Sequence, residues 1–462
     1  MDGWTAIVLA AGRGSRMRSN VPKPLQPIAG SPLLVHALRT LREAGADACV
    51  VVASPADADA LRTVAEDATL VEQAEPLGTG DALRVGLKAL PPTARLAVAI
   101  NADVPLVRPG SVQALLHAHN ADGAVFGLLT AQVPRMQAAG LGRVRRDAEG
   151  APEAVVEAQD DAGGTADAEV NVGCYSLDVG WARTALAALP SHPSGEFHLP
   201  ALAAAARKDG HFVAAVRVGE ASEALSVNTR ADQTSAEAAM QARLRSRAIE
   251  AGASLVDPAS TYLDADTVLE ADAVIQPNTA VRGRSRVSAG ALVGPNAVLH
   301  DAIVGPGARI AGAVVEGAEV GEGAHVGPFS YLREGTVLEP GAYVGSHAEV
   351  KASRIGRGAH VGHFSYVGDA EVGAGANIGA GTVTCNYDGR EKHRTIIGEG
   401  AFIGSDSLLV APVRVGAGAL TGAGAVVTEN VPDGARVAGV PARPLARRNR
   451  PMAGGEGERT LG

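Results

Sequence analysis

The sequence, 462 residues long, predicts two folds in succession: a doubly wound α/β domain and, after it, a parallel β-helix of hexapeptide repeats. In the first half, short apolar strand patterns alternate with helical patterns, an order typical of sheets with helices on both faces. In the second half, an aliphatic residue returns about every six positions from Val320 to Val427, usually followed by glycine. This period fits neither an α-helix nor a plain strand, and is typical of short strands wound into a β-helix.

The first half begins with WTAIVLA, residues 4–10, which has the pattern of a buried strand and leads into the glycine-rich segment AGRGSRM. Further helix and strand patterns alternate over residues 32–44, 49–53, 57–67, 69–73, 80–90 and 96–101. Ligands of doubly wound sheets bind beyond the carboxyl ends of the strands. Three motifs are expected at that edge: the Gly12–Arg16 loop, Gly78-Thr79-Gly80 and Asp103.

The glycine-rich loop predicts a site for phosphate groups. It is not a dinucleotide fingerprint, because Met17 stands where GxGxxG requires its third glycine. Backbone N–H groups of such a loop can wrap a triphosphate, while Arg16 and Lys23 neutralise its charge. Asp103, in NADVPL, places a carboxylate at a strand end, and carboxylate oxygens are good ligands for Mg²⁺.

The second half predicts a triangular prism, with three short strands to a coil of about eighteen residues and the aliphatic residues inside. The expected inward series is Val320, Val326, Leu332, Leu338, Val344, Val350, Ile355, Val361, Val367, Val372, Ile378 and Thr384. Positions one coil apart stack, so Arg333 is expected over Lys351, and His363 over Ala380.

One edge of the prism is expected to carry polar side chains. The repeat is interrupted by CNYDGREKHRTI, residues 385–396, which is expected to leave the prism as a loop. The count of residues brings to the edge of this loop Arg333, Lys351, His363 and Tyr366. Cations beside a histidine predict a site for an anionic substrate with a general base. Glu349 and Asp369 are both candidates to orient the histidine, and the sequence does not choose between them.

Composition argues against several classes of function and location. The formal charge of −9 argues against nucleic acid as a partner. No apolar run reaches about 18 residues, and no basic region precedes the apolar start, so neither a membrane span nor a signal peptide is expected. The three scattered cysteines, Cys49, Cys174 and Cys385, favour a reducing, cytoplasmic location. The absence of CxxC and HExxH patterns gives no support for zinc.

Longer motifs carry a family resemblance. The first half contains LAAGRGSRM with PKP, QAEPLGTGDA, ADVPL, GLGRV, VVEAQDDA, EVNVG and SVNTR. The second contains YLREG, VGHFSYVGDAEVGAGANIGAGTVTCNYDG and FIGSDSLLVAPV. Because of these motifs, the chain resembles the bacterial bifunctional N-acetylglucosamine-1-phosphate uridyltransferase/glucosamine-1-phosphate N-acetyltransferase family. The resemblance covers all of the chain except about the last twenty residues. The block in the second half is the more specific, because other sugar nucleotidyltransferases share the individual motifs of the first.

The resemblance implies a nucleotidyltransferase in the first fold and a left-handed β-helix in the second. It implies an enzyme that acetylates glucosamine-1-phosphate with acetyl-CoA and then transfers UMP from UTP to the product, giving UDP-N-acetylglucosamine and pyrophosphate. This is a precursor step for peptidoglycan and other cell-envelope polymers. It further implies Mg²⁺ as cofactor and a homotrimer. The expected domains are 1–230 for uridyl transfer, a helical linker 231–253, the β-helix 254–440 and a mostly disordered tail 441–462.

The resemblance also implies roles for individual residues. Nucleotide contacts are expected at Leu9, Ala10, Ala11, Gly12, Lys23, Gln73, Gly78 and Thr79. Contacts on the sugar-phosphate side are expected at Asn101, Ala102, Asp103, Gly142, Glu157, Asn171 and Asn228, with Asp103 and Asn228 also on Mg²⁺. In the second half, glucosamine-1-phosphate contacts are expected at Arg333, Lys351, Tyr366 and Asn377, with His363 as proton acceptor. Acetyl-CoA contacts are expected at Ala380, Asn386, Tyr387, Ser405 and Ala423.

The chain departs from the family pattern near the predicted sugar. Asn101-Ala102 replaces Tyr-Gly, and Val172 replaces threonine. The segment GEFHLPA, residues 195–201, lacks the usual tyrosine and acid and has His198 and Pro200 instead. These changes predict altered sugar discrimination. Gly439 also stands where an arginine is often found, and Arg443 is the nearby candidate to bind the CoA phosphate.

Two other functions stay open from the sequence. One is a nucleotidyltransferase with a single activity, whose β-helix only assembles or regulates the protein. Such a prism would lack the His/Tyr/Lys cluster and the NYDG loop. The other is a non-enzymatic scaffold with a degenerate first domain, which exchange of pyrophosphate into UDP-N-acetylglucosamine would distinguish from an enzyme.

Overall fold

The computed structural model describes residues 3–12, 14–134, 138, 140–156 and 167–445. The chain forms two compact units, Met1–Arg243 and Leu244–Gly462. The division between them falls within helix α7, Arg230–Glu250. In the described part of the chain, no helix has the length and apolar character that crossing a membrane requires.

The first unit is built on a mixed sheet with the strand order β11-β7-β10-β6-β1-β4-β5. These strands are β1 (Thr5–Ala10), β4 (Ala48–Ala53), β5 (Thr69–Glu72), β6 (Leu96–Asn101), β7 (Phe126–Val133), β10 (Ala168–Asp178) and β11 (Val213–Arg217). β1 pairs in parallel with both β4 and β6, whereas β10 pairs antiparallel with β6 and β7. The strand order therefore reverses at β1, which is the point where ligands of such sheets bind.

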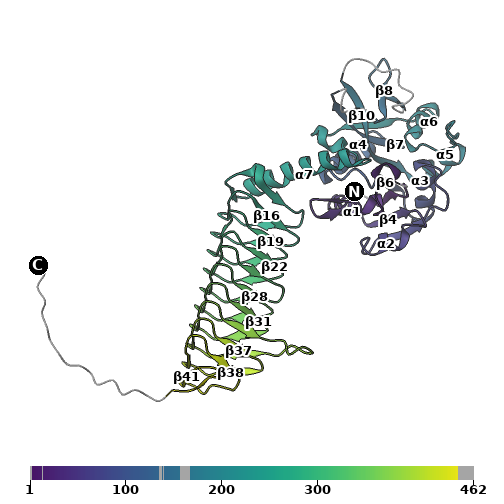
Figure 1. Ribbon diagram of the computed structural model, residues 1–462. Helices are drawn as coiled ribbons and strands as arrows, with labels where there is room; N and C mark the ends of the chain where they lie inside the picture. Colours follow the sequence, from purple (N-terminus) through teal and green to yellow (C-terminus); the bar gives the residue numbers. More distant parts are fainter. Residues whose placement is uncertain (1–2, 13, 135–137, 139, 157–166, 446–462) are drawn as a thin grey trace, which may run out of the picture. The chain divides into compact units, whose positions relative to one another are not determined.

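Helices cover both faces of this sheet (Figure 1). On one face lie α1 (Leu33–Glu43), α2 (Ala58–Arg62) and α4 (Pro109–Ala121), which pack around Val8. On the other lie α3 (Thr79–Lys88), α5 (Val179–Ala188) and α6 (Leu202–Lys208), which pack around Ile7. Neighbouring residues of one strand face opposite sides, so both sides of β1 are buried. The predicted doubly wound α/β fold is confirmed.

One predicted helix is shorter than expected. The predicted helix at 57–67 ends at Arg62. Thr63 and Val64 follow it, and both are β-branched residues that favour a helix less. Glu66 then adopts the left-handed conformation, with φ of 53°, which a continuing helix does not allow. The other predicted helices and strands of this half begin and end within two residues of the expected positions.

The second unit is enclosed by three walls of parallel strands (Figure 1). Successive strands go to different walls, as β24 (His325–Val326), β25 (Tyr331–Leu332) and β26 (Val337–Leu338) illustrate. The wall of β24 has twelve strands, the wall of β25 ten and the wall of β26 nine. This arrangement is the left-handed parallel β-helix expected for the second half.

The predicted inward series forms the core of the prism. Every member of that series is at most 4% exposed. Leu332 pairs with Val350, and Val350 with Val367, in the register that the count of residues requires. The polar member, Thr384, is accommodated because its Oγ1 accepts a hydrogen bond from the Gly368 N–H at 2.8 Å.

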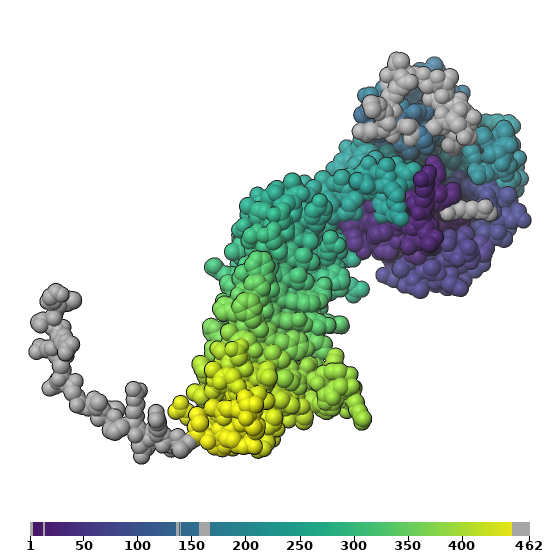
Figure 2. Space-filling model, viewed as in Figure 1, coloured from purple at the N-terminus to yellow at the C-terminus, as the bar shows by residue number. Residues whose placement is uncertain are grey.

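Two segments leave the regular coil. Residues 386–394 lie between β34 (Val383–Cys385) and β35 (Thr395–Ile397), and they project from the stacked coils as the yellow-green protrusion in Figures 1 and 2. The predicted loop is therefore confirmed, with its end residues in strands. At the end of the prism, β42 (Arg443–Pro444) pairs with β41 (Arg436–Ala438). This last pairing is antiparallel, unlike the parallel pairing of the coils, and residues 446–462 of the predicted tail lie outside the described residues.

Candidate active sites

A pocket of about 960 Å³ opens in the first unit at the carboxyl ends of β1 and β6. The residues nominated from the sequence that line it are Leu9, Ala10, Ala11, Gly12, Arg16, Lys23, Gln73, Gly78, Thr79, Asn101, Ala102, Asp103, Gly142, Asn171 and Asn228. Glu157, the remaining nominee, lies outside the described residues. The structure therefore brings together in one pocket the site residues that were predicted for the first half and that it describes. Their binding roles remain predictions.

The start of α3 forms one wall of this pocket by close backbone packing. Gly78 precedes the helix with φ of 91°, which favours glycine. A Cβ at Gly78 or Gly80 would come within 2.7 or 3.0 Å of the Phe197 carbonyl oxygen. The Gly80 N–H donates to that oxygen at 2.7 Å. The GTG motif is thereby fixed against residues 195–201, the segment that departs from the family pattern.

Asp103 and Asn228 meet around the ammonium group of Lys23. The Lys23 Nζ donates to Asp103 Oδ2 at 2.5 Å and to Asn228 Oδ1 at 2.7 Å. The other Asp103 oxygen, Oδ1, is buried and has no hydrogen-bond partner among the described residues. The two oxygens that converge on Lys23, together with the unpartnered Asp103 Oδ1, fit Mg²⁺, which is commonly held by one or two protein groups and by substrate phosphates.

Asn228 is held in place by the start of α7. The Asp232 carboxylate accepts hydrogen bonds from the backbone N–H groups of Asn228 at 3.0 Å and Thr229 at 2.7 Å. In return, the Asp232 N–H donates to Thr229 Oγ1 at 3.2 Å. This is a capping box, and its T-x-x-D pattern in the sequence is the signal that could have identified Asp232.

Two further residues hydrogen-bond the pocket-lining amides of Gln73 and Asn171 and were not predicted from the sequence; of these, Tyr175 itself lines the pocket. Asp81 accepts a hydrogen bond from Gln73 at 2.9 Å and fixes that amide in the pocket wall. The Tyr175 hydroxyl accepts one from Asn171 at 2.7 Å. Asp81 lies in the first turn of α3 and Tyr175 within β10. Their positions in ordinary helix and strand patterns gave no signal of a binding role.

The departures from the family pattern all line the pocket, and two of them, Ala102 and Val172, also belong to the buried core. The pocket is lined by all five of these residues: Asn101, Ala102, Val172, His198 and Pro200. His198 stacks on His192 with ring centroids 4.7 Å apart, and its Nε2 lies 3.5 Å from Glu196 Oε2. The substitutions therefore change the lining of the pocket.

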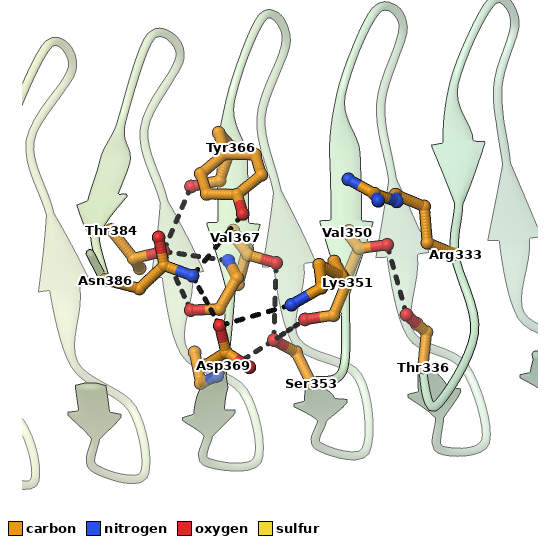
Figure 3. Close-up of polar contacts among 12 residues, drawn as sticks. Arg333, Thr336, Val350, Lys351, Ser353, Tyr366, Val367, Asp369, Thr384 and Asn386 are labelled. Atoms are coloured by element: carbon orange, nitrogen blue, oxygen red, sulfur yellow. Dashed lines mark hydrogen bonds and ion pairs between the residues drawn. The ribbon is translucent and has the colours of Figure 1, made fainter. Parts of the chain in front are cut away.

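In the second unit, a polar cluster lies at the base of the projecting loop (Figure 3). Asn386 donates to Asp369 Oδ2 at 2.5 Å and to the Tyr366 hydroxyl at 3.4 Å. Lys351 Nζ lies 3.5 Å from the same Asp369 oxygen. On the next coil, Arg333 donates to Glu349 at 2.9 Å. The structure thus brings these nominated residues of the β-helix together on one wall.

The cluster is rich in positive charge. The ammonium of Lys392, from the projecting loop, interacts unfavourably with that of Lys351, and this lowers the pKa of Lys392. Arg333 adds a third positive charge to this group. Closely placed cations with a lowered lysine pKa are the arrangement expected where an anion such as a phosphate binds.

His363 lies in the turn before the strand of Tyr366, β31 (Tyr366–Gly368). Its Nδ1 is 2.8 Å from Ser346 Oγ. The two carboxylates considered from the sequence face cations instead: Glu349 binds Arg333 and Asp369 binds Lys351. Among the contacts described here neither orients the histidine, and Ser346 takes that place.

The residues nominated for acetyl-CoA stack below His363. The Gly381 N–H donates to His363 O at 2.9 Å, and the Asp406 N–H donates to Ala380 O at 2.8 Å. The Gly424 N–H continues the series with Ser405 O at 2.8 Å. His363, Ala380, Ser405 and Ala423 therefore form one vertical column on successive coils. The side chains of this column are small, and their predicted role in binding acetyl-CoA stays a prediction.

Three nominated residues lie apart from the cluster. Asn377, in β33 (Asn377–Ile378), pairs with His360 on the wall of β24, whereas Tyr366 belongs to the wall of β25. Tyr387, on the loop, is 60% exposed. Arg443 is exposed and lies 3.7 Å from Glu429. The nominated sugar-phosphate contacts thus occupy two walls, on either side of the turn that holds His363.

Comparison with known proteins relates the chain to a family. Residues 6–164 match the family described as the MobA-like NTP transferase domain. The protein named "Bifunctional protein GlmU" from Heliobacterium modesticaldum is 40% identical over 437 residues, covering 94% of this chain and 95% of its own. Its namesake from Alkalilimnicola ehrlichii is 43% identical over 432 residues, covering 92% of each. That from Streptomyces avermitilis is 41% identical over 435 residues, covering 93% of this chain and 90% of its own. The chain belongs to the family of the bifunctional GlmU proteins.

Proposed function

We propose that the protein catalyses two successive reactions. The second unit transfers the acetyl group of acetyl-CoA to glucosamine-1-phosphate, and the first unit transfers UMP from UTP to the resulting N-acetylglucosamine-1-phosphate. We assign the first reaction to residues 254–440 and the second to residues 1–230, with 231–253 as linker. The observation that carries the proposal is the cluster of Lys351, Tyr366 and Asn386 on the β-helix. A purely structural β-helix does not require such a cluster of polar side chains.

In uridyl transfer, an oxygen of the sugar phosphate attacks the α-phosphorus of UTP. The new P–O bond forms as the bond to the leaving pyrophosphate breaks. Such chemistry depends on positioning and on neutralising charge. Lys23 and Arg16, which both reach Asn228, supply positive charge, and the glycine-rich loop supplies backbone N–H groups. Asp103 and Asn228 would hold Mg²⁺, which when bound neutralises charge on the phosphates.

In acetyl transfer, the sugar amine attacks the thioester carbonyl carbon while His363 removes a proton from the nitrogen. The C–N bond forms, the C–S bond breaks, and the coenzyme A thiolate recovers the proton from the imidazolium. Arg333, Lys351 and Lys392 are placed to bind the sugar phosphate. Burial raises the pKa of the Cys385 thiol, which disfavours the thiolate and supports direct attack over a covalent acyl-cysteine.

The proposal is tested by two separate assays on the full chain. Exchange of labelled pyrophosphate into UTP in the presence of UDP-N-acetylglucosamine measures uridyl transfer, and release of coenzyme A with glucosamine-1-phosphate measures acetyl transfer. Both signals are expected. Pyrophosphate exchange without coenzyme A release would favour the nucleotidyltransferase with one activity, and the absence of both would favour the scaffold.

The assembly proposed for the β-helix is a homotrimer with acetyltransferase sites between copies. Tyr366 and Asn377 lie on different walls of one prism, so a single copy presents them on either side of a convex corner. A neighbouring prism would close that corner, and three-fold packing satisfies every copy alike. We also propose a cytoplasmic location, which the three cysteines, free of disulfide bonds, support.

This assembly predicts complementation between inactive variants. His363→Ala and Tyr387→Ala chains are each expected to lose acetyl transfer, and mixed trimers to recover part of it, because some sites then receive both intact residues. Activity is measured after the two chains are unfolded and refolded together, with mass spectrometry to confirm mixing. Mixed trimers without activity would contradict the sharing of sites, and a monomer in solution would contradict the assembly.

The substitutions in the sugar pocket predict weaker rejection of incorrect sugars. A pocket discriminates strongly where it hydrogen-bonds a substrate group, and Val172 and Pro200 offer no side-chain hydrogen bonds. The ratio of kcat/KM for N-acetylglucosamine-1-phosphate to that for glucose-1-phosphate is expected to be modest, about 10 to 200 as for apolar contacts. A ratio above about 10⁴, typical of hydrogen-bonded discrimination, would show that the substitutions do not affect sugar specificity.

A further inference from the structure

Ser346 closes one side of the His363 ring. Its Oγ lies 2.8 Å from Nδ1. A Cβ on the neighbouring Gly345 would come within 3.2 Å of the same nitrogen and 3.4 Å of the Tyr343 ring. The coil above therefore packs closely on the Nδ1 side of the imidazole. His363 is nevertheless an exposed residue, so a substrate can reach it.

We propose that Ser346 is a positioning residue for acetyl transfer, which selects the tautomer of His363. The Nδ1–H group donates to Ser346 Oγ, and this leaves Nε2 without a proton and able to accept one from the sugar amine. The opposite arrangement, with the serine hydroxyl donating to Nδ1, would place the proton on Nε2 and remove the base. The inference rests on the proposed function of His363.

The hydrogen bond strengthens as the reaction proceeds. When Nε2 takes the amine proton, the ring becomes an imidazolium and its Nδ1–H becomes a charged donor. Charge-assisted hydrogen bonds are about twice as strong as neutral ones. Ser346 therefore stabilises the transition state more than the ground state, which raises kcat without a matching change in KM.

Ser346→Ala is expected to lower kcat for acetyl transfer by about two- to tenfold, the usual net effect of one hydrogen bond. KM for acetyl-CoA and glucosamine-1-phosphate should change little. Ser346→Thr, which keeps the hydroxyl, should retain most of the activity. Ser288→Ala, a half-buried serine on another coil, is the matched control, and the melting temperature with circular dichroism reports the folding of every variant.

Nitrogen-15 NMR of the imidazole gives a second readout. The wild-type His363 is expected in the Nδ1–H tautomer, and Ser346→Ala should give a mixture. An unchanged kcat in Ser346→Ala, or an Nε2–H tautomer in the wild type, would overturn the inference. If His363→Ala itself keeps acetyl transfer, the proposed base is wrong; if it is inactive while Ser346→Ala is normal, only the role of Ser346 fails.

An independent observation concerns Lys23. Its ammonium lies between Asp103 Oδ2 and Asn228 Oδ1, at 2.5 and 2.7 Å. The Lys23 and Asp103 side chains are only 14% and 19% exposed. Arg16 brings a second cation to Asn228 Oδ1, at 3.2 Å. The oxygens of the two candidate metal ligands thus already contact cationic side chains of the protein, Lys23 and Arg16.

The geometry points to a further role for Lys23: it occupies the place of the divalent cation until a nucleotide draws it away. A triphosphate offers the ammonium a more highly charged partner, and the move would free both oxygens. The inference rests on the proposed ligands Asp103 and Asn228. Nucleotide and divalent cation should then bind with positive coupling, each raising the affinity for the other by the same factor.

Binding of Mn²⁺ to the full chain, measured by electron paramagnetic resonance, tests this role without catalysis. Wild-type protein is expected to bind Mn²⁺ weakly, and UTP should strengthen the binding. Lys23→Met removes the competing charge and should tighten Mn²⁺ binding without nucleotide by at least about tenfold. Lys88→Met, at an exposed lysine of α3, should leave it unchanged.

Equal or weaker Mn²⁺ binding by a folded Lys23→Met variant would overturn the inference, with the melting temperature as the check on folding. The double variant Lys23→Met/Asp103→Ala separates this outcome from failure of the metal site. It is expected to lose the gain in affinity. Tight binding that survives the loss of Asp103 would mean that the cation sits elsewhere and that the proposed ligand itself is wrong.

Discussion

Asp103→Ala is expected to reduce uridyl transfer by about a thousandfold, because several kcal/mol of charge stabilisation depend on the proposed metal ligand. Acetyl transfer should stay within about twofold of the wild type, since substitutions at sites that share no partners usually act independently. Asp103 lies in the pocket of the first unit, whereas the cluster around Lys351 belongs to the second. Both rates are measured on the same purified chain.

Two further variants sharpen this prediction. Asp122→Ala removes an exposed carboxylate after α4 and should leave both activities intact. Asp103→Asn keeps the shape of the side chain but not its charge, and should be nearly as impaired as the alanine variant. A folded Asp103→Ala protein that lost both activities would contradict the assignment of one reaction to each unit.

His363→Ala is expected to have the opposite effect. It should lower acetyl transfer by about 10² to 10⁴, the usual contribution of a general base, and leave uridyl transfer unchanged. The column of Ala380, Ser405 and Ala423 below it remains intact, so acetyl-CoA should still bind. The measurements are the kcat for coenzyme A release and the dissociation constant of acetyl-CoA.

His300→Ala is the matched control, because His300 is an exposed histidine on an earlier coil of the same β-helix. It is expected to keep both activities. If His363→Ala kept full acetyl transfer, the proton would have to leave the amine by another route. If instead acetyl-CoA no longer bound, the histidine would be a binding residue and not the base.

The stacking of the β-helix is predictable from the sequence because one short unit repeats and residues one coil apart meet. The count of residues places Leu332, Val350 and Val367 on one line, and the structure pairs them in that register. The projecting loop is predictable for the same reason, since Arg390 stands in CNYDGREKHRTI where the period of six after Thr384 requires an inward aliphatic residue. In the first unit, alternating patterns and glycine motifs locate the pocket at the strand ends.

The contacts of His363 are not predictable in this way. Periodicity shows which residues share an edge, but hydrogen-bond partners depend on how charges distribute among neighbours. Glu349 and Asp369 are both close in the count, yet each faces a cation. Ser346 carries no charge and belongs to no motif, so nothing in the sequence distinguishes it from other serines.

The placement of Asn377 relative to Tyr366 is likewise not predictable from the sequence. Resemblance groups it with Tyr366, although the two residues face outward on different walls. A sequence encodes the order of walls within one chain and not the surfaces that meet between copies. The capping box of Thr229 and Asp232, in contrast, could have been predicted from the sequence, because both partners lie within one helical turn.

The most direct test of the central claim is a single incubation of the purified chain with glucosamine-1-phosphate, acetyl-CoA, UTP and Mg²⁺, with every product identified by mass. The expected products are coenzyme A, N-acetylglucosamine-1-phosphate, UDP-N-acetylglucosamine and pyrophosphate, with the acetylated sugar phosphate appearing before the nucleotide sugar. Accumulation of N-acetylglucosamine-1-phosphate without any UDP-sugar, or formation of UDP-glucosamine without acetylation, would contradict the account of one chain with two successive activities.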